Sequence, residues 1–62
     1  MREYINMVED LETIYDIPTD IVKENGKYYV VVNGHYVYAN TRFNSCLNVL
    51  KAIYITITNI NQ

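Results

Sequence analysis

The spacing of apolar residues changes twice along this chain, from a helical repeat to strict alternation and back. In residues 2–16 the apolar positions recur every three or four residues, which predicts an amphipathic helix. Pro18 disfavours the α conformation of the residue before it, so we expect this helix to end near Asp16. The apolar positions of this segment are Tyr4, Ile5, Val8, Leu11 and Tyr15.

The middle of the chain, residues 20–39, consists of β-forming segments separated twice by Asn-Gly. Both residue types tolerate the positive φ that a two-residue type I′ turn requires, so Asn25-Gly26 and Asn33-Gly34 each predict a tight hairpin. Two hairpins that share their middle segment predict a three-stranded antiparallel meander.

Two-residue loops also predict the register and the two faces of this sheet. In the first hairpin Val30 should pair with Ile21, and in the second with Val37, while Tyr28 pairs with Ala39. Side chains alternate with period two. One face is then Ile21, Lys23, Tyr28, Val30, Val32, His35, Val37 and Ala39, and its small β-branched centre should pack against the helices. The other face is Val22, Glu24, Lys27, Tyr29, Val31, Tyr36 and Tyr38, rich in tyrosine with charged edges.

A helical spacing returns after Asn40. The Ile-Thr alternation of residues 53–58 is also typical of a fourth strand, but the helical stripe runs through it without Gly or Pro. We therefore favour a helix to about residue 58, and a single α+β domain over residues 1–62 with the order αβββα. The stripe consists of Phe43, Cys46, Leu47, Leu50, Ile53, Tyr54 and Ile57.

The length of 62 residues limits the core that the chain can build. A domain of this size buries only about 60% of its unfolded surface, so disulfides, a metal or oligomerisation often support it. Cys46 is the sole cysteine and His35 the sole histidine, which excludes an intrachain disulfide and leaves too few ligands for structural zinc. We expect no cofactor and a homodimer, with an interface at apolar positions beside the main stripe of the last helix. These positions are Val49, Ala52 and Ile55.

The expected compartment depends on the start of the chain and on its thiol. No apolar segment of a secretory signal comes after Met1, and no apolar run reaches about 18 residues, so we expect no membrane partner. An unpaired thiol is typical of the reducing cytoplasm. Abundant Ile, Asn, Tyr and Lys are typical of AT-rich coding, as in many phages.

Charge is distributed unevenly. All seven carboxylates lie in the first 24 residues, against Arg2 and Lys23, so that this segment carries −5 while the remainder carries +3. Such a surface either keeps the protein in solution or steers a basic protein partner towards it. The residues that we expect to steer are Glu9, Asp10, Glu12 and Asp16.

Catalytic chemistry has few candidates. Cys46 and His35 would be a nucleophile and its base, but Cys46 belongs to the apolar stripe, where a cysteine usually acts as a small hydrophobe. The carboxylates of the first helix point outward and nothing near them would raise a pKa. The sequence has no phosphate-binding or metal-binding motif. We expect a protein that is not an enzyme.

The leading hypothesis is a small protein-binding module, encoded by a phage or mobile element, that inhibits or modulates a host protein by occupying its surface. Tyrosine offers a large amphipathic contact area at low entropic cost. The anchoring residues would be Tyr29, Val31, Tyr36 and Tyr38.

Two alternatives stay open. The sheet could bind nucleic acid by stacking bases on tyrosine, although only Lys27, Arg42 and Lys51 are available to meet phosphates. The chain could also be a purely structural subunit of a homo-oligomer. Independently of these alternatives, the last helix or a second copy could cover the tyrosine face, which would then not be a contact surface for another protein.

Overall fold

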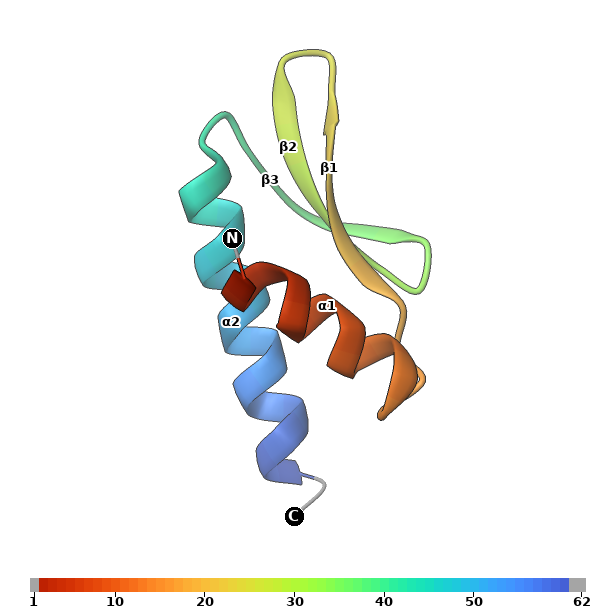
Figure 1. Ribbon diagram of the computed structural model, residues 1–62. Coiled ribbons are helices and arrows are strands. Elements are labelled where there is room, and N and C mark those ends of the chain that lie inside the picture. Colours follow the sequence, from red (N-terminus) through yellow and green to blue (C-terminus); the bar gives the residue numbers. More distant parts are fainter. Residues whose placement is uncertain (1, 61–62) are drawn as a thin grey trace.

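The computed structural model describes residues 2–60 and shows the predicted αβββα order of a small α+β fold (Figure 1). The last helix continues to Ile60, so the helical interpretation of residues 53–58 is confirmed and the fourth strand is wrong. The elements are α1 (Arg2–Thr13), β1 (Thr19–Glu24), β2 (Lys27–Val32), β3 (His35–Asn40) and α2 (Phe43–Ile60).

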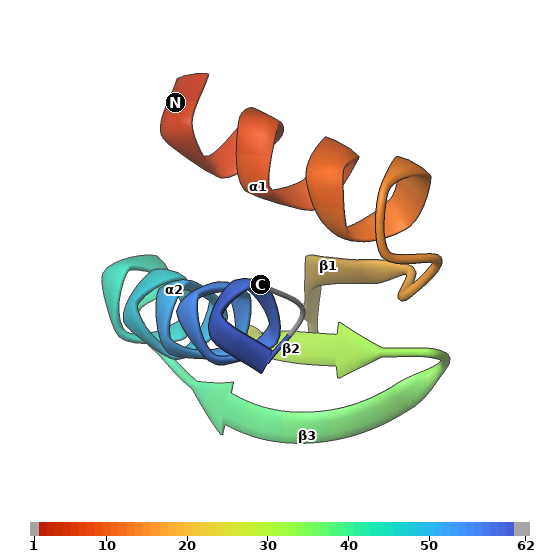
Figure 2. The same ribbon diagram turned by 90° about the horizontal axis from the view of Figure 1, so that it is seen from below.

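The sheet has the strand order β1-β2-β3, with α2 packed against one of its faces. The other helix, α1, crosses α2 and runs along β1 (Figure 2). We expected both helices on the same face, but α1 straddles the edge of the sheet at β1. Ile21, on the side of α2, packs into the core that α1 shares, whereas Val22, on the other side, lines a hollow beneath α1.

The core forms where the apolar stripes of α1 and α2 meet. Leu11 and Leu50 are fully buried, and Met7 is nearly so. Burying a side chain of this kind stabilises the fold by about 1.5–3 kcal/mol. Ile5, which the spacing placed in the stripe, is 51% exposed. Each residue turns a helix by about 100°, so Ile5 lies well away from the side of α1 on which Met7 and Leu11 are buried. The partly buried residues around this core are Tyr4, Val8, Tyr15, Ile21, Leu47, Tyr54 and Ile57.

The first helix ends at Thr13, before the predicted end at Asp16. The backbone carbonyl of Asp10 accepts hydrogen bonds from the N–H groups of Ile14 and Tyr15, and Ile17 donates to the carbonyl of Leu11 over 2.7 Å. Asp16 adopts φ of +56°, a left-handed conformation that Asp tolerates better than most residues. This conformation ends the helix and directs the chain into Pro18.

The first hairpin has the predicted register over its whole length. Asn25 and Gly26 have φ of +52° and +78°, as a type I′ turn requires. Val30 pairs with Ile21, and Glu24 with Lys27.

The second hairpin matches the prediction only near its turn. Val32 pairs with His35 and Val31 with Tyr36, but a β-bulge comes next and Val30 pairs with Tyr38. The predicted pairs of Val30 with Val37 and of Tyr28 with Ala39 are therefore wrong. The observed partners beyond the bulge are Val30–Tyr38, Tyr29–Ala39 and Tyr28–Asn40.

The bulge moves Tyr38 from the predicted tyrosine face to the face covered by α2, because residues directly opposite each other share a face. Val37 does not join the core and is 53% exposed. The physical reason lies in the start of α2. The Asn40 amide donates to the Tyr38 hydroxyl over 3.0 Å, and its carbonyl oxygen accepts the Arg42 N–H over 2.9 Å. Asn40 is thereby held at the start of α2 in its pair with Tyr28, and the bulge takes up the one residue that β3 has in excess between Tyr36 and Tyr38.

Candidate protein-binding surface

One face of the sheet is not covered by α2, and we call it the open face. It presents Tyr29 and Val31 of β2, which flank the buried Val30 in the sequence, and their pairing partners Val22 of β1 and Tyr36 of β3. Tyr36 is 53% exposed, and the other three are partly buried. The open face therefore keeps two of the three tyrosines that the sequence placed there.

The two tyrosines of the open face hold each other in position. Their rings meet edge to face, with centroids 5.3 Å apart and planes at 71°. The Tyr36 hydroxyl donates a hydrogen bond of 2.6 Å to the Glu24 carboxylate, across the sheet on β1. This hydrogen bond is the main reason that the pKa of Tyr36 is raised. Rings fixed in this way lose little conformational freedom when a partner covers them.

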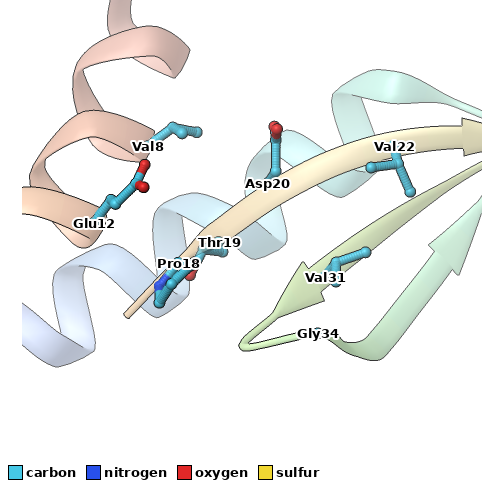
Figure 3. Close-up of a pocket in the computed structure, with 8 residues that line it drawn as sticks. All are labelled: Val8, Glu12, Pro18, Thr19, Asp20, Val22, Val31 and Gly34. Carbon is cyan, nitrogen blue, oxygen red and sulfur yellow. The ribbon is translucent and has the colours of Figure 1, made fainter. Parts of the chain in front are cut away.

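A hollow of about 250 Å³ lies beside the open face, between α1 and the sheet (Figure 3). Its apolar lining comes from Val8 on α1, Val22 on β1 and Val31 on β2. Two carboxylates, of Glu12 and Asp20, add a negative rim. The remaining lining residues are Pro18, Thr19 and Gly34.

Hydrogen bonds in the connections fix the walls of this hollow. The Asn33 N–H donates to the carbonyl of Pro18 over 2.8 Å, which holds the β2–β3 turn against the segment between α1 and β1. The Thr19 hydroxyl donates to the carbonyl of Ile17 over 2.9 Å, and Thr19 is buried. The hollow is thus part of the folded structure rather than of a loose loop.

The Asp20 carboxylate at the rim is positioned by two donors. It accepts hydrogen bonds from the Tyr4 hydroxyl on α1 and from the Ile21 N–H, the latter over 2.7 Å. Burial, together with the smaller effect of the bond to Asp20, raises the pKa of Tyr4 to about 12. Tyr4 therefore keeps its proton at neutral pH and continues to donate to Asp20.

The acidic residues divide into two groups. Glu3 forms an ion pair of 2.6 Å with Lys51, and Asp10 accepts a 2.7 Å hydrogen bond from the Tyr54 hydroxyl, so both fasten α1 to α2. The side chains of Glu9, Glu12 and Asp16 are exposed and make no hydrogen bond or ion pair within residues 2–60. Of the four residues predicted to steer a partner, these three are available for that role.

Cys46 and His35 lie apart. Cys46 is fully buried, its thiol donates to the carbonyl of Tyr28 over 3.5 Å, and burial raises its pKa. Tyr28 pairs with Asn40 at one end of β3, whereas the exposed His35 begins the strand, about 16 Å away. The two side chains do not form a nucleophile–base pair.

Two features are absent from the described part of the chain. Within residues 2–60, no group of three or more His, Cys, Asp or Glu side chains is placed to hold a metal ion. Neither described helix combines the length and the apolar character needed to cross a bilayer.

Comparison of the chain with protein-family models, with curated proteins and with solved structures found no match. The features of this chain that bear on function are therefore the open face and the hollow beside it.

Proposed function

We propose that this chain is a small protein-binding module that uses the open face and the adjacent hollow to bind a basic segment of another protein. The observation that carries the proposal is the juxtaposition of an uncovered aromatic sheet face with an apolar hollow that has a carboxylate rim. The module modulates its partner by covering the part of the partner's surface that it binds. The reducing cytoplasm is the compartment that suits its unpaired Cys46 thiol.

The apolar part of the site suits one large side chain of the partner. The volume of about 250 Å³ is below the range of about 300–1,000 Å³ that is usual for small-molecule sites. The hollow continues into a surface with two fixed tyrosine rings, and tyrosine is among the residues that contribute most to protein interfaces. An aliphatic or aromatic side chain seated in the hollow would bring its neighbours onto Tyr29 and Tyr36.

The charged part of the site favours a basic partner. Glu12 lies at the hollow, Glu9 is three residues earlier on α1, and Asp16 lies just beyond the helix. These exposed carboxylates attract Lys or Arg on approach and raise the association rate, an effect that weakens with salt.

The same arrangement gives less support to nucleic acid as the partner. The Lys23 ammonium lies 5.5 Å from the centre of the Tyr28 ring, on the side of α2, and Lys51 is paired with Glu3. Lys27 stands opposite Glu24 at the β1–β2 turn. Few cations near the open face are left to neutralise phosphates, on which nucleic-acid affinity mainly depends.

Selection of peptides from a random display library on the immobilised protein tests the proposal. We expect enriched sequences to carry Lys or Arg next to a large apolar residue. In NMR titrations, one such peptide should shift the signals of Val8, Val22, Val31 and Tyr36. Enrichment of acidic sequences, no enrichment, or shifts confined to α2 would contradict the proposed function.

Matched variants make this test sharper. Tyr36→Ala should weaken binding of the selected peptide at least about tenfold, because it removes an exposed anchor. Tyr38→Phe, on the opposite face, should bind like the wild type. Glu12→Gln should slow association at low salt and have little effect at high salt.

A further inference from the structure

A second apolar surface lies on α2, away from the open face. Val49, Ala52, Ile53 and Thr56 line a hollow of about 330 Å³, with Ile57 at its border to the core. We call the first four residues, together with Ile60, the α2 stripe. They recur at helical spacing over three turns, and Ile60 is 74% exposed.

The α2 stripe differs from the predicted interface in one residue. Val49 and Ala52 belong to it, as expected, but Ile55 does not line the hollow. Each residue turns a helix by about 100°, which places Ile55 on the far side of Ala52 from Ile53. Ile55 is itself 56% exposed and becomes a control position for the experiment below.

The shape of the stripe suits another helix. Ala52 and Thr56 are small and lie about one turn apart on α2, and the larger Val49 and Ile53 line the same hollow. Ridges and grooves of this kind allow two helices to pack closely. The same surface can be both ridge and groove for its twofold-related copy.

The electrostatics favour a second copy over a charged partner. Lys51 is the single charged residue of α2, and it is paired with Glu3 on the side of α1. A basic or acidic partner would therefore find no opposite charge on the α2 stripe. The stripe of a second copy is equally uncharged, so the two stripes themselves do not repel each other, although the chain as a whole carries −2.

The size of the α2 stripe determines the affinity that we expect for an interface formed there. The 18 residues of α2 span about 27 Å, and the last turns reach beyond the sheet (Figure 1). A contact strip of this length and one helix width belongs to the small interfaces, below about 1,200 Å² in total. Such an interface is expected to dissociate in the micromolar range.

We infer that a second copy of this chain covers the α2 stripe, with the two α2 helices crossing near Ala52 and Thr56 about a twofold axis. The dimer presents two open faces, because the stripe lies on α2 and the open face lies on the uncovered side of the sheet. Two linked sites bind a partner with repeated epitopes far more tightly than one site does.

Sedimentation velocity between about 1 µM and about 1 mM tests the inference. The wild type should change from monomer to dimer with rising concentration. Thr56→Glu places a charge in the centre of the stripe and should stay monomeric, whereas Ile55→Glu, on the adjacent exposed residue, should dimerise like the wild type. A wild type that is monomeric at the highest concentration, or equal effects of both substitutions, would overturn the inference.

Two controls make the result interpretable. Ala52→Glu is a second disruptive variant at another exposed position, and the far-UV spectrum of each variant checks that it folds. A dimer that persists in both folded stripe variants would exclude this interface. The inference is independent of the proposed function, because Thr56→Glu should retain the affinity of each open face for a soluble peptide, and Tyr36→Ala should still dimerise.

Discussion

The two hairpins start from the same dipeptide and the same turn geometry, yet only the first keeps a regular register to its end. Asn25-Gly26 and Asn33-Gly34 have φ values within a few degrees of each other. The first hairpin pairs without interruption, while the second changes register between Val30 and Val31. A turn thus determines pairing near itself, and the element that comes after the strand determines the pairing further away.

The difference between the two hairpins arises from the length of the connection between each outer strand and the helix next to it in the sequence. Five residues separate α1 from β1, so that connection can adjust to the sheet. Two residues, 41–42, separate β3 from α2, and Asn40 already binds the backbone of Arg42. The end of β3 is therefore held by α2, and the bulge at Val37 absorbs the mismatch with the turn.

The two tyrosines that the bulge separates should contribute very differently to the stability of the fold. Tyr38→Ala should lower the free energy of unfolding by about 2 kcal/mol, because it removes a partly buried ring beneath α2 and the hydrogen bond from Asn40. Tyr36→Ala should cost less than about 1 kcal/mol, since that ring is exposed. Urea denaturation of both variants measures the two losses of unfolding free energy. Equal losses would contradict the placement of the two rings on opposite faces of the sheet.

The next effect tests whether the two turns are equivalent. Gly26→Ala and Gly34→Ala should each cost about 1–2 kcal/mol, because an alanine is strained at φ near +80°. A Cβ atom meets nothing within 4 Å at either position, so sterics should add nothing. Thermal unfolding should show similar losses. A much larger loss at Gly34 would mean that the bulge depends on that turn.

Deletion of Val37 tests the bulge itself. Without this residue, Tyr36 and Tyr38 are consecutive and can still pair with Val31 and Val30 in a regular ladder. We expect the deletion variant to fold with a loss of less than about 1 kcal/mol. If β3 were regular, the deletion would instead move every side chain between position 37 and α2 to the opposite face of the sheet. An unfolded variant would therefore show that β3 has no bulge.

The hydrogen bond from Tyr4 on α1 to Asp20 on β1 should make a smaller, pH-dependent contribution to stability. The pKa of Tyr4 rises from 10.0 to about 12 on folding, so the folded state holds this proton more tightly than the unfolded state. The corresponding stability is present below pH 10 and is lost as the pH rises towards 12. Denaturation at a series of pH values should show a shallower decline for Tyr4→Phe. An unchanged decline would exclude Tyr4 as its source.

The sequence was sufficient for the order of elements, both turns, the first register and the helical end of the chain. These features depend on local spacing and turn chemistry. The bulge was not predictable in this way, because its cause is the packing of α2. The hollow depends on the hydrogen bond from the Asn33 N–H to the Pro18 carbonyl. The hydrogen bond from Tyr54 to Asp10 joins α2 to α1. Only tertiary structure brings such pairs together.

The binding surface illustrates the same limit. Alternation along β2 correctly placed Tyr29 and Val31 on one face, opposite the buried Val30. It could not show that Val8 and Glu12 of α1 would lie beside them, since the spacing of Val8 is that of an ordinary core residue. The hollow adds to the candidate site a feature that no motif in the sequence indicates.

An extra residue in β3 separates Tyr38 from Tyr29 and Tyr36, and cross-strand nuclear Overhauser effects detect this separation without any substitution. We expect contacts from Val30 to Tyr38 and from Tyr29 to Ala39, with the Tyr38 ring close to α2. Contacts from Val30 to Val37 and from Tyr29 to Tyr38 would show a regular second hairpin and would contradict this separation.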